Sequence, residues 1–215
     1  MEGGRSIAPL INSLLDMPAF VSRIATQDYH PPDHISFASN HPAPNNQPFR
    51  SYVEMQNPAP GKSHETKPQL LWPVHCVAAS PGAAIIPEID HVGKVDIYAK
   101  KGMDSRVEMY SVFSDAFGNL DPALARKSVD TDVQTALRKK GVTDVFVVGL
   151  AGDYCVKYTA IDAARAGFRS WLIQDATRCV DPGPGWVRSL AELREKGVSV
   201  ITSDGPEVAR LKSQG

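Results

Sequence analysis

Residues 144–174 read DVFVVGLAGDYCVKYTAIDAARAGFRSWLIQ, and this stretch decides the fold. Asp144–Leu150 is a continuous apolar run of strand length, and Ser170–Gln174 is a second one. Between them, Val156–Ala166 is rich in alanine and ends at Gly167, a residue favoured just beyond the end of a helix. A strand–helix–strand order in which the strands are apolar on both faces predicts parallel strands covered by helices on both sides.

The same alternation continues on both sides of this stretch. Further helices are predicted at Ile7–Leu15, Asp130–Lys140, Trp186–Lys196 and Gly205–Ser213, and further strands at Phe20–Thr26, Val95–Ala99 and Val198–Thr202. The sequence therefore predicts the α/β class, with a doubly wound, mainly parallel sheet and helices on both faces. In such a sheet, ligands bind beyond the carboxyl ends of the strands.

Length and composition predict one domain that spans residues 1–215. Its one irregular part is 31–70, which is rich in Pro, Asn, Ser and His and has almost no periodicity. We expect a long loop insertion there, and loops of this length are usually functional. A solvated insertion without a function is the alternative.

The charge balance bears on partners. Lys and Arg number 23 against 24 Asp and Glu, a net charge of -1, so no basic surface for nucleic acid and no polybasic membrane patch is expected. No apolar run approaches the length of a membrane helix. The expected partner is a small-molecule substrate, and a homo-oligomer stays open.

Cysteine usage and the chain ends bear on location. Three cysteines at long spacings favour a reducing compartment over a disulfide framework. The N-terminal residues lack the pattern of a secretory signal, and the C-terminal LKSQG is not a peroxisomal tripeptide. We expect an intracellular protein, cytoplasmic first, with nucleus and peroxisome as alternatives.

Reactive side chains follow three predicted strands. Asp28 and His30 come after the first, Lys100 and Lys101 after the second, and Ala151–Cys155 after the third. Reactive residues at three strand ends predict one shared site.

Cys155 is the candidate nucleophile, because it is predicted to open a helix directly after a buried strand. Free N–H groups and the helix dipole favour a thiolate there, and the same N–H groups can hold an oxyanion. A buried structural cysteine is the alternative. Cys76 and Cys179 have weaker contexts and are interpreted as structural.

Asp28 and His30 are candidate metal ligands, because residues two apart in an extended chain point to the same side. A third ligand would come from the remaining histidines, His34, His41, His64, His75 and His91. A loop histidine with an ordinary hydrogen bond is the alternative. A lysine near the thiol would lower its pKa, but the residues alone do not choose between Lys100 and Lys101.

Four segments together resemble the nicotinamidases, a branch of the isochorismatase-like cysteine hydrolases, and the eukaryotic type above all. They are QDYHPPDHISFASNH at 27–41, LLWPVHC at 70–76, KKGMDSRVEMYSVF at 100–113 and VGLAGDYCVKYTAIDAARAGF at 148–168. The resemblance runs nearly end to end and implies a doubly wound sheet with a Cys–Lys–Asp triad and a divalent metal, usually zinc.

The resemblance also implies roles for individual residues. Cys155 is the implied nucleophile, Lys101 the triad lysine, Asp28, His30 and His75 the metal ligands, Ala151 and Cys155 the oxyanion hole, and Trp72 and Tyr154 the aromatic walls for a pyridine ring. The family turn further implies a cis peptide bond between Leu150 and Ala151.

The sequence departs from the family at its start. The family begins with an apolar strand that ends in the triad aspartate, and here the match begins at Gly4, in the family's first helix. We therefore expect the first strand of the fold, and with it the catalytic aspartate, to be missing. We therefore expect a nicotinamidase that converts nicotinamide to nicotinate and ammonia in NAD salvage (pyridine nucleotide biosynthesis), with impaired activity in the chain as written. The alternatives are a catalytically impaired metal- or ligand-binding homologue, and an amidase of the same fold that acts on another small amide.

Overall fold

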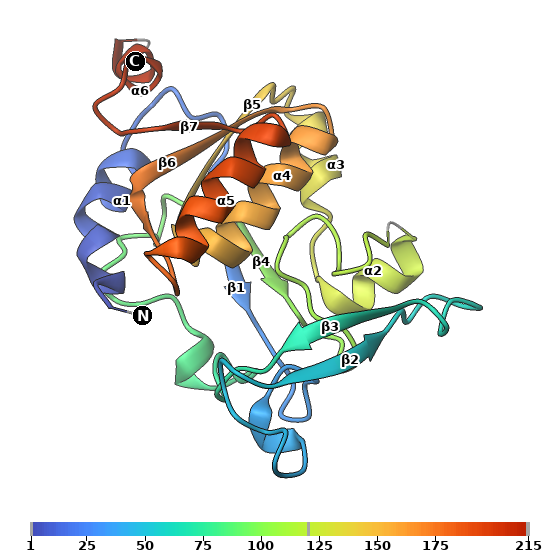
Figure 1. The fold of residues 1–215 in the computed structure, drawn as a ribbon. Helices are drawn as coiled ribbons and strands as arrows, with labels where there is room; N and C mark the ends of the chain where they lie inside the picture. Colours follow the sequence, from blue (N-terminus) through green and yellow to red (C-terminus); the bar gives the residue numbers. More distant parts are fainter. Residues whose placement is uncertain (1, 120, 214–215) are drawn as a thin grey trace. The chain divides into compact units, whose positions relative to one another are not determined.

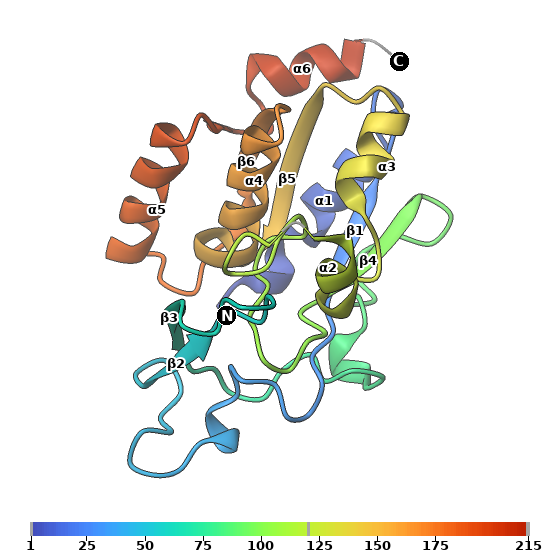
Figure 2. The same cartoon turned by 90° about the vertical axis from the view of Figure 1, so that its right-hand side faces the viewer.

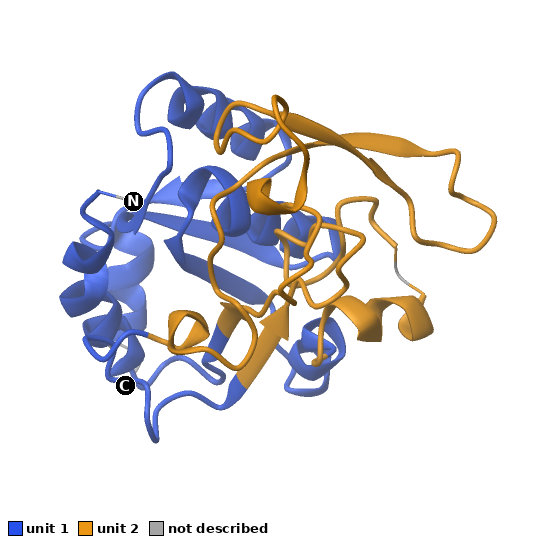
Figure 3. Cartoon of the chain, turned by 90° about the horizontal axis from the view of Figure 1, so that it is seen from below, with its two compact units in different colours: residues 1–25, 86–97, 132–215 blue, residues 26–85, 98–131 orange. Residues whose placement is uncertain are grey.

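The computed structural model describes residues 2–119 and 121–213. The chain divides into two compact units, coloured separately in Figure 3. Unit 1 comprises residues 1–25, 86–97 and 132–215, and unit 2 comprises residues 26–85 and 98–131. The single domain over 1–215 stays a prediction.

Unit 1 contains a three-stranded parallel sheet in the order β5-β6-β7, visible in Figure 1. Its strands are β5 (Asp144–Leu150), β6 (Arg169–Arg178) and β7 (Ser199–Ile201). Its helices are α1 (Ala8–Leu15, after the 3₁₀ turn η1, Gly4–Ile7), α3 (Val133–Lys139), α4 (Lys157–Arg165), α5 (Pro184–Glu195) and α6 (Pro206–Ser213). The strand–helix alternation predicted from the sequence is confirmed here.

The two faces of β6 bury different helices. Leu172 is fully buried with residues of α4 and α5, whereas its neighbour Ile173 is fully buried with residues of α1 and α6. Side chains alternate along a strand, so consecutive apolar residues serve opposite faces. Figure 2 shows α4 and α5 on one side of β5 and β6 and α1 on the other. The helices on both faces follow the prediction of a doubly wound sheet.

The strand β5 departs from the expected burial. Its first six residues are half-buried and Leu150 is exposed. The cause is its place at the edge of the described sheet, where β6 is its partner on one side. The strands of the described residues fall into three sheets, and not one, since β1-β4 and β2-β3 form two further pairs.

One of the two further strand pairs lies wholly in unit 2, and the other lies mostly in it. The strands β1 (Ile24–Asp28) and β4 (Ile97–Lys101) form one two-stranded sheet, and each crosses from unit 1 into unit 2. The strands β2 (Tyr52–Gln56) and β3 (Thr66–Leu70) form an antiparallel hairpin. The remaining elements of unit 2 are α2 (Pro122–Ser128) and the short 3₁₀ turns η2 (Ala38–Asn40) and η3 (Pro81–Ala83).

The hairpin corrects the interpretation of 31–70 as a long loop. Tyr52–Gln56 alternates in burial, and Met55 is 1% exposed, so this face packs into unit 2. The polar composition around it concealed the alternation. Pro68 fits because β3 pairs with β2 alone in the described sheet, and a proline needs an edge that lacks a ladder partner.

Element boundaries differ from the predictions in ways that local chemistry explains. The predicted helix from Asp130 begins at Val133, because Asp132 caps it and accepts the N–H of Thr135. The predicted strand Phe20–Thr26 lies at Ile24–Asp28, and Val95–Ala99 lies at Ile97–Lys101. Among the helices that the structure describes, none is both long and apolar enough to cross a membrane.

Candidate active site

The segment Asp28–His30 is bonded to the backbone on two sides. The N–H of Tyr29 donates to the carbonyl of Lys101 at 2.8 Å, at the end of β4. The N–H of His30 donates to the carbonyl of Cys76 at 3.0 Å, and its carbonyl accepts the N–H of Ala78 at 2.8 Å. Main-chain hydrogen bonds therefore place the end of β1 between Lys101 and the segment that carries His75.

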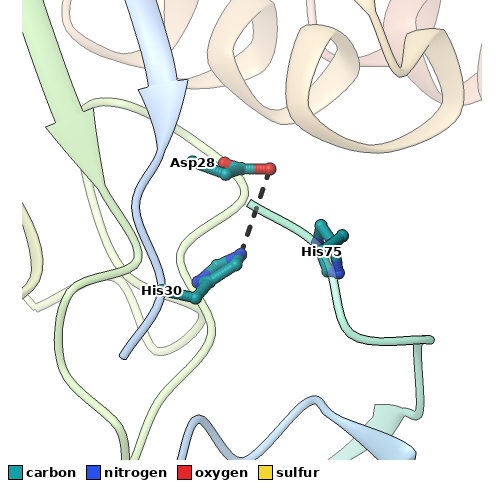
Figure 4. A group of neighbouring side chains, drawn as sticks. All are labelled: Asp28, His30 and His75. Carbon is teal, nitrogen blue, oxygen red and sulfur yellow. Dashed lines mark ion pairs between the residues drawn. The ribbon is translucent and has the colours of Figure 1, made fainter. Parts of the chain in front are cut away.

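Asp28, His30 and His75 form a group that could hold a metal ion (Figure 4). One ligand atom from each lies within 4.8 Å of the others, and Oδ2 of Asp28 lies 4.0 Å from Nε2 of His30. Two ligands at about 2.0–2.2 Å from one tetrahedral zinc ion lie about 3.3–3.6 Å apart, so side-chain movements of about 1 Å would bring these atoms to that spacing. A carboxylate with two imidazoles is a donor set that suits zinc.

Both imidazoles are oriented by backbone carbonyls. Nδ1 of His30 lies 2.8 Å from the carbonyl oxygen of Gly102, and Nδ1 of His75 lies 2.8 Å from that of Pro73. A carbonyl only accepts, so each Nδ1 carries a proton, and the Nε2 lone pair of the neutral ring is the one available to a metal. Such outer hydrogen bonds fix the tautomer that a metal requires.

The position that follows Lys101 requires a glycine, which is Gly102. Its φ is +68°, and a Cβ there would lie 2.4 Å and 2.6 Å from two atoms of the His30 ring. A side chain would therefore be strained and would also displace the imidazole.

Lys101 is buried, at 2% exposed, and forms an ion pair with Asp28. Its Nζ lies 2.5 Å from Oδ1 of Asp28 and 2.9 Å from the carbonyl oxygen of Met109. Burial acts to raise the pKa of Asp28, but the Lys101 ammonium and the nearby imidazoles outweigh it and hold that pKa below its usual range. Lys100 instead lies over the ring of Tyr29, 4.4 Å from its centroid.

A second group of potential ligands shares His30. It consists of His30, His34 and Glu108, all buried. Nε2 of His34 has no hydrogen-bond partner within standard geometry, and burial lowers its pKa to about 4. His34 was among the candidate third ligands, whereas Glu108 had no signal beyond its place in the segment 100–113. His41, His64 and His91 are in neither group.

Trp72 is buried in unit 2 and is held by Tyr110. Its Nε1–H donates to the Tyr110 hydroxyl at 3.1 Å, and the same hydroxyl accepts Nε2–H of Gln69 at 2.9 Å. Phe49 packs edge-on against Trp72, with ring centroids 5.4 Å apart. Tyr110 was missed, although it stands in the segment that carries the resemblance; Tyr154, the other expected wall, lies in unit 1.

Cys155 lies in unit 1, in a π-helical turn, Gly152–Val156 (η4), and not at the first turn of α4 as expected. The N–H groups of Tyr154 and Val156 both donate to the carbonyl of Ala151, at 3.1 Å and 3.0 Å. The wider turn delays the α-helix to Lys157. The peptide bond between Leu150 and Ala151 is cis, as the resemblance implies.

The other two cysteines have strongly raised pKa values. Burial, together with Asp28, raises the pKa of Cys76 to about 11. Burial, together with Asp153, raises the pKa of Cys179 to about 12. Both side chains stay thiols at neutral pH, which fits their interpretation as structural.

Comparisons with known proteins agree with this geometry. Residues 23–205 match the isochorismatase domain. A nicotinamidase of Acinetobacter baylyi is 34% identical over 203 residues, which cover 94% of this chain and 84% of that protein. The yeast nicotinamidase bound to the inhibitor nicotinaldehyde has a TM-score of 0.82 at 30% identity, covering 94% of this chain and 90% of its own. A pyrazinamidase of Pyrococcus horikoshii in complex with zinc has a TM-score of 0.66 at 26% identity, covering 94% and 88%. On the family match and the similarity to these proteins, the chain belongs to the isochorismatase family and has its α/β fold.

Proposed function

We propose that this protein hydrolyses nicotinamide to nicotinate and ammonia, a step of NAD salvage, through a thioester on Cys155. The observation that carries the proposal is the Asp28–His30–His75 group, with two imidazoles that present Nε2 beside the buried Lys101. Support comes from two of the proteins named above, the Acinetobacter and yeast nicotinamidases, which this chain matches over most of their length.

The three candidate metal ligands favour a substrate that has a ring nitrogen. Asp28, His30 and His75 would hold a divalent metal, which we propose is zinc. When bound, the metal supplies a Lewis acid that accepts the lone pair of a pyridine nitrogen. An amide attached to a pyridine ring is therefore a more suitable substrate than an aliphatic amide.

The covalent steps are assigned to the chain's own residues. The Cys155 thiolate attacks the amide carbon, and the N–H groups of Ala151 and Cys155 stabilise the oxyanion. Ammonia leaves, and water hydrolyses the thioester. Trp72 and Tyr154 contact the ring in this proposal. Lys101 supplies positive charge, and the family resemblance implies that an aspartate takes the proton of the thiol and passes it to the nitrogen that leaves as ammonia.

The test measures ammonia and nicotinate released from nicotinamide by the full-length protein. Cys155→Ala should abolish release, because the raised pKa values of Cys76 and Cys179 keep both of those side chains as unreactive thiols at neutral pH. Cys76→Ser and Cys179→Ser are the matched controls and should keep most of the activity. Activity of even a few per cent in Cys155→Ala would contradict the assignment.

Two further outcomes separate the alternatives. Turnover of an aliphatic primary amide with none of nicotinamide would identify another amidase and reject the proposal. Zinc binding without hydrolysis of any amide would identify a ligand-binding homologue and would also reject it.

A further inference from the structure

A buried carboxylate stands two residues before Cys155 in the same turn. Asp153 is 6% exposed. Its Oδ1 accepts the N–H of Val180 at 2.9 Å, and its Oδ2 accepts the N–H of Asp181 at 2.8 Å. Both oxygens therefore bind consecutive backbone groups of the segment that follows β6, and all of these residues belong to unit 1.

The segment to which Asp153 binds is itself tied to α5. The Asp181 carboxylate accepts the N–H of Gly183 at 3.0 Å and the N–H of Gly185 at 2.8 Å. A Cβ at Gly185 would lie 2.5 Å from Oδ2 of Asp181, so the helix start is in close contact with this carboxylate. Asp153 and Asp181 thus join the nucleophile turn, which is the π-helical turn Gly152–Val156, to the first turn of the twelve-residue helix α5.

Close packing supports the same connection. A Cβ at Gly152 would lie 2.6 Å from Cγ2 of Thr177 and 2.7 Å from Sγ of Cys179. The turn therefore lies directly against the end of β6, and Asp153 binds the residues that come next. Interiors packed to this density transmit small displacements instead of absorbing them.

We propose that Asp153 is a positioning residue for Cys155, which fixes the turn that carries the thiol and the oxyanion-hole N–H groups. The inference rests on the proposed function for its catalytic consequence. A carboxylate is required because both oxygens must accept; an asparagine has one acceptor and would turn an NH₂ group toward a backbone N–H. A glutamate keeps two acceptors but is longer by one methylene group.

The experiment compares Asp153→Asn with Asp175→Asn in the full-length protein. Asp175 is the matched control, since its Oδ1 accepts the N–H of Ser203 at 2.9 Å and its Oδ2 accepts the Ser203 hydroxyl, so this carboxylate also joins two segments of unit 1 but binds Ser203 instead of residues 180 and 181. The first readout is hydrogen–deuterium exchange of residues 151–157, which needs no substrate. The second is kcat and KM for nicotinamide.

Asp153→Asn should speed exchange in 151–157 and lower kcat about 10- to 100-fold, because a displacement of about 1 Å at a reacting group has costs of this order. KM should stay within about twofold of the wild-type value, because both carboxylate oxygens of Asp153 bind backbone N–H groups instead of substrate. Asp175→Asn should leave both kcat and the exchange of the turn unchanged. Asp153→Glu, which keeps two acceptors, should fold and should also lose kcat.

The readouts separate failure of the inference from failure of the proposed function. Unchanged exchange in Asp153→Asn, or a wild-type kcat in Asp153→Glu, would overturn the role of Asp153. An equal loss of kcat in Asp175→Asn would also overturn it, because the effect would then be general destabilisation. The wild-type protein could fail to hydrolyse nicotinamide while Asp153→Asn still speeds exchange in residues 151–157. That result would reject the proposed function and support the role of Asp153 in fixing the turn.

Discussion

At the scale of single residues, Gly102 offers the sharpest test of the metal group. In Gly102→Ala the new Cβ would meet the His30 ring at 2.4 Å, and the carbonyl that orients Nδ1 would shift. Loss of such an outer hydrogen bond typically lowers metal affinity about 10- to 100-fold. Zinc affinity, measured by competition with a chelating dye, should fall by that factor.

The control for this substitution is Gly118→Ala. Gly118 has a φ of +75°, and a Cβ there would meet nothing within 4 Å. It therefore reproduces the backbone strain without the contact, and zinc affinity should stay at the wild-type value. Equal losses in the two variants would show that strain, and not His30, is responsible.

Asp28 should contribute to stability as well as to metal binding. In Asp28→Asn, measured without metal, the buried Lys101 loses its opposite charge, and breaking a buried ion pair costs about 3–5 kcal/mol of the free energy of unfolding. The exposed Asp33→Asn should change it by less than about 0.5 kcal/mol. Urea unfolding gives both values, and a loss below 1 kcal/mol for Asp28→Asn would count against the pair.

The difference in unfolding free energy between the wild-type protein and Asp28→Asn should depend on pH. The folded-state pKa of Asp28 is lowered from 3.8, so the pair's contribution is fully present above the unfolded-state value. It is lost as pH falls through the lower folded-state pKa. The wild-type and Asp28→Asn stabilities should therefore converge only in strong acid.

At the scale of elements, periodicity predicted unit 1 well and unit 2 poorly. The strand Asp144–Leu150 was placed at its observed bounds, because an apolar run between charged and turn residues leaves little choice. The hairpin Tyr52–Leu70 was missed because its one deeply buried side chain on β2, Met55, stands among polar residues. The helix Pro122–Ser128 was also missed, although Asp121 followed by proline is a cap signal.

Candidate residues followed a similar division. Asp28 and His30 were found from their spacing, but only the resemblance selected His75 and Lys101 from several equivalent residues. Hydrogen bonds to carbonyls of Gly102 and Pro73, which decide the tautomers, depend on backbone positions that no spacing rule gives. The π-helical turn at Cys155 is likewise a matter of tertiary packing.

The cap of α3 gives a prediction at this scale. Asp132 accepts the N–H of Thr135 at 2.9 Å, so Asp132→Ala removes a partner for the helix start. The cost should be about 1 kcal/mol of unfolding free energy, whereas Asp132→Ser keeps an acceptor and should lose only a few tenths. Chemical denaturation measures both, and equal stabilities for the two variants would show that the cap contributes nothing.

At the scale of the whole molecule, the metal should stabilise the folded chain. A ligand that binds only the folded state adds about 2.7 kcal/mol when its concentration is 100 times Kd. Zinc should raise Tm, and EDTA should reverse the rise. His75→Ala should lose most of this response, and the exposed His64→Ala should keep it. A Tm that does not respond to zinc would argue against the site.

The hydrogen bonds that join His30 to Cys76 and Ala78 also close a loop in the chain, from Pro31 to His75. Closing a flexible loop costs entropy that grows only with the logarithm of its length, about 0.6 kcal/mol for each doubling. Extra residues inserted at the exposed Gly61, far along that loop from its closure, would therefore cost little and leave the two histidines in register. The hairpin is the part of this fold in which length can change while the chemistry stays the same.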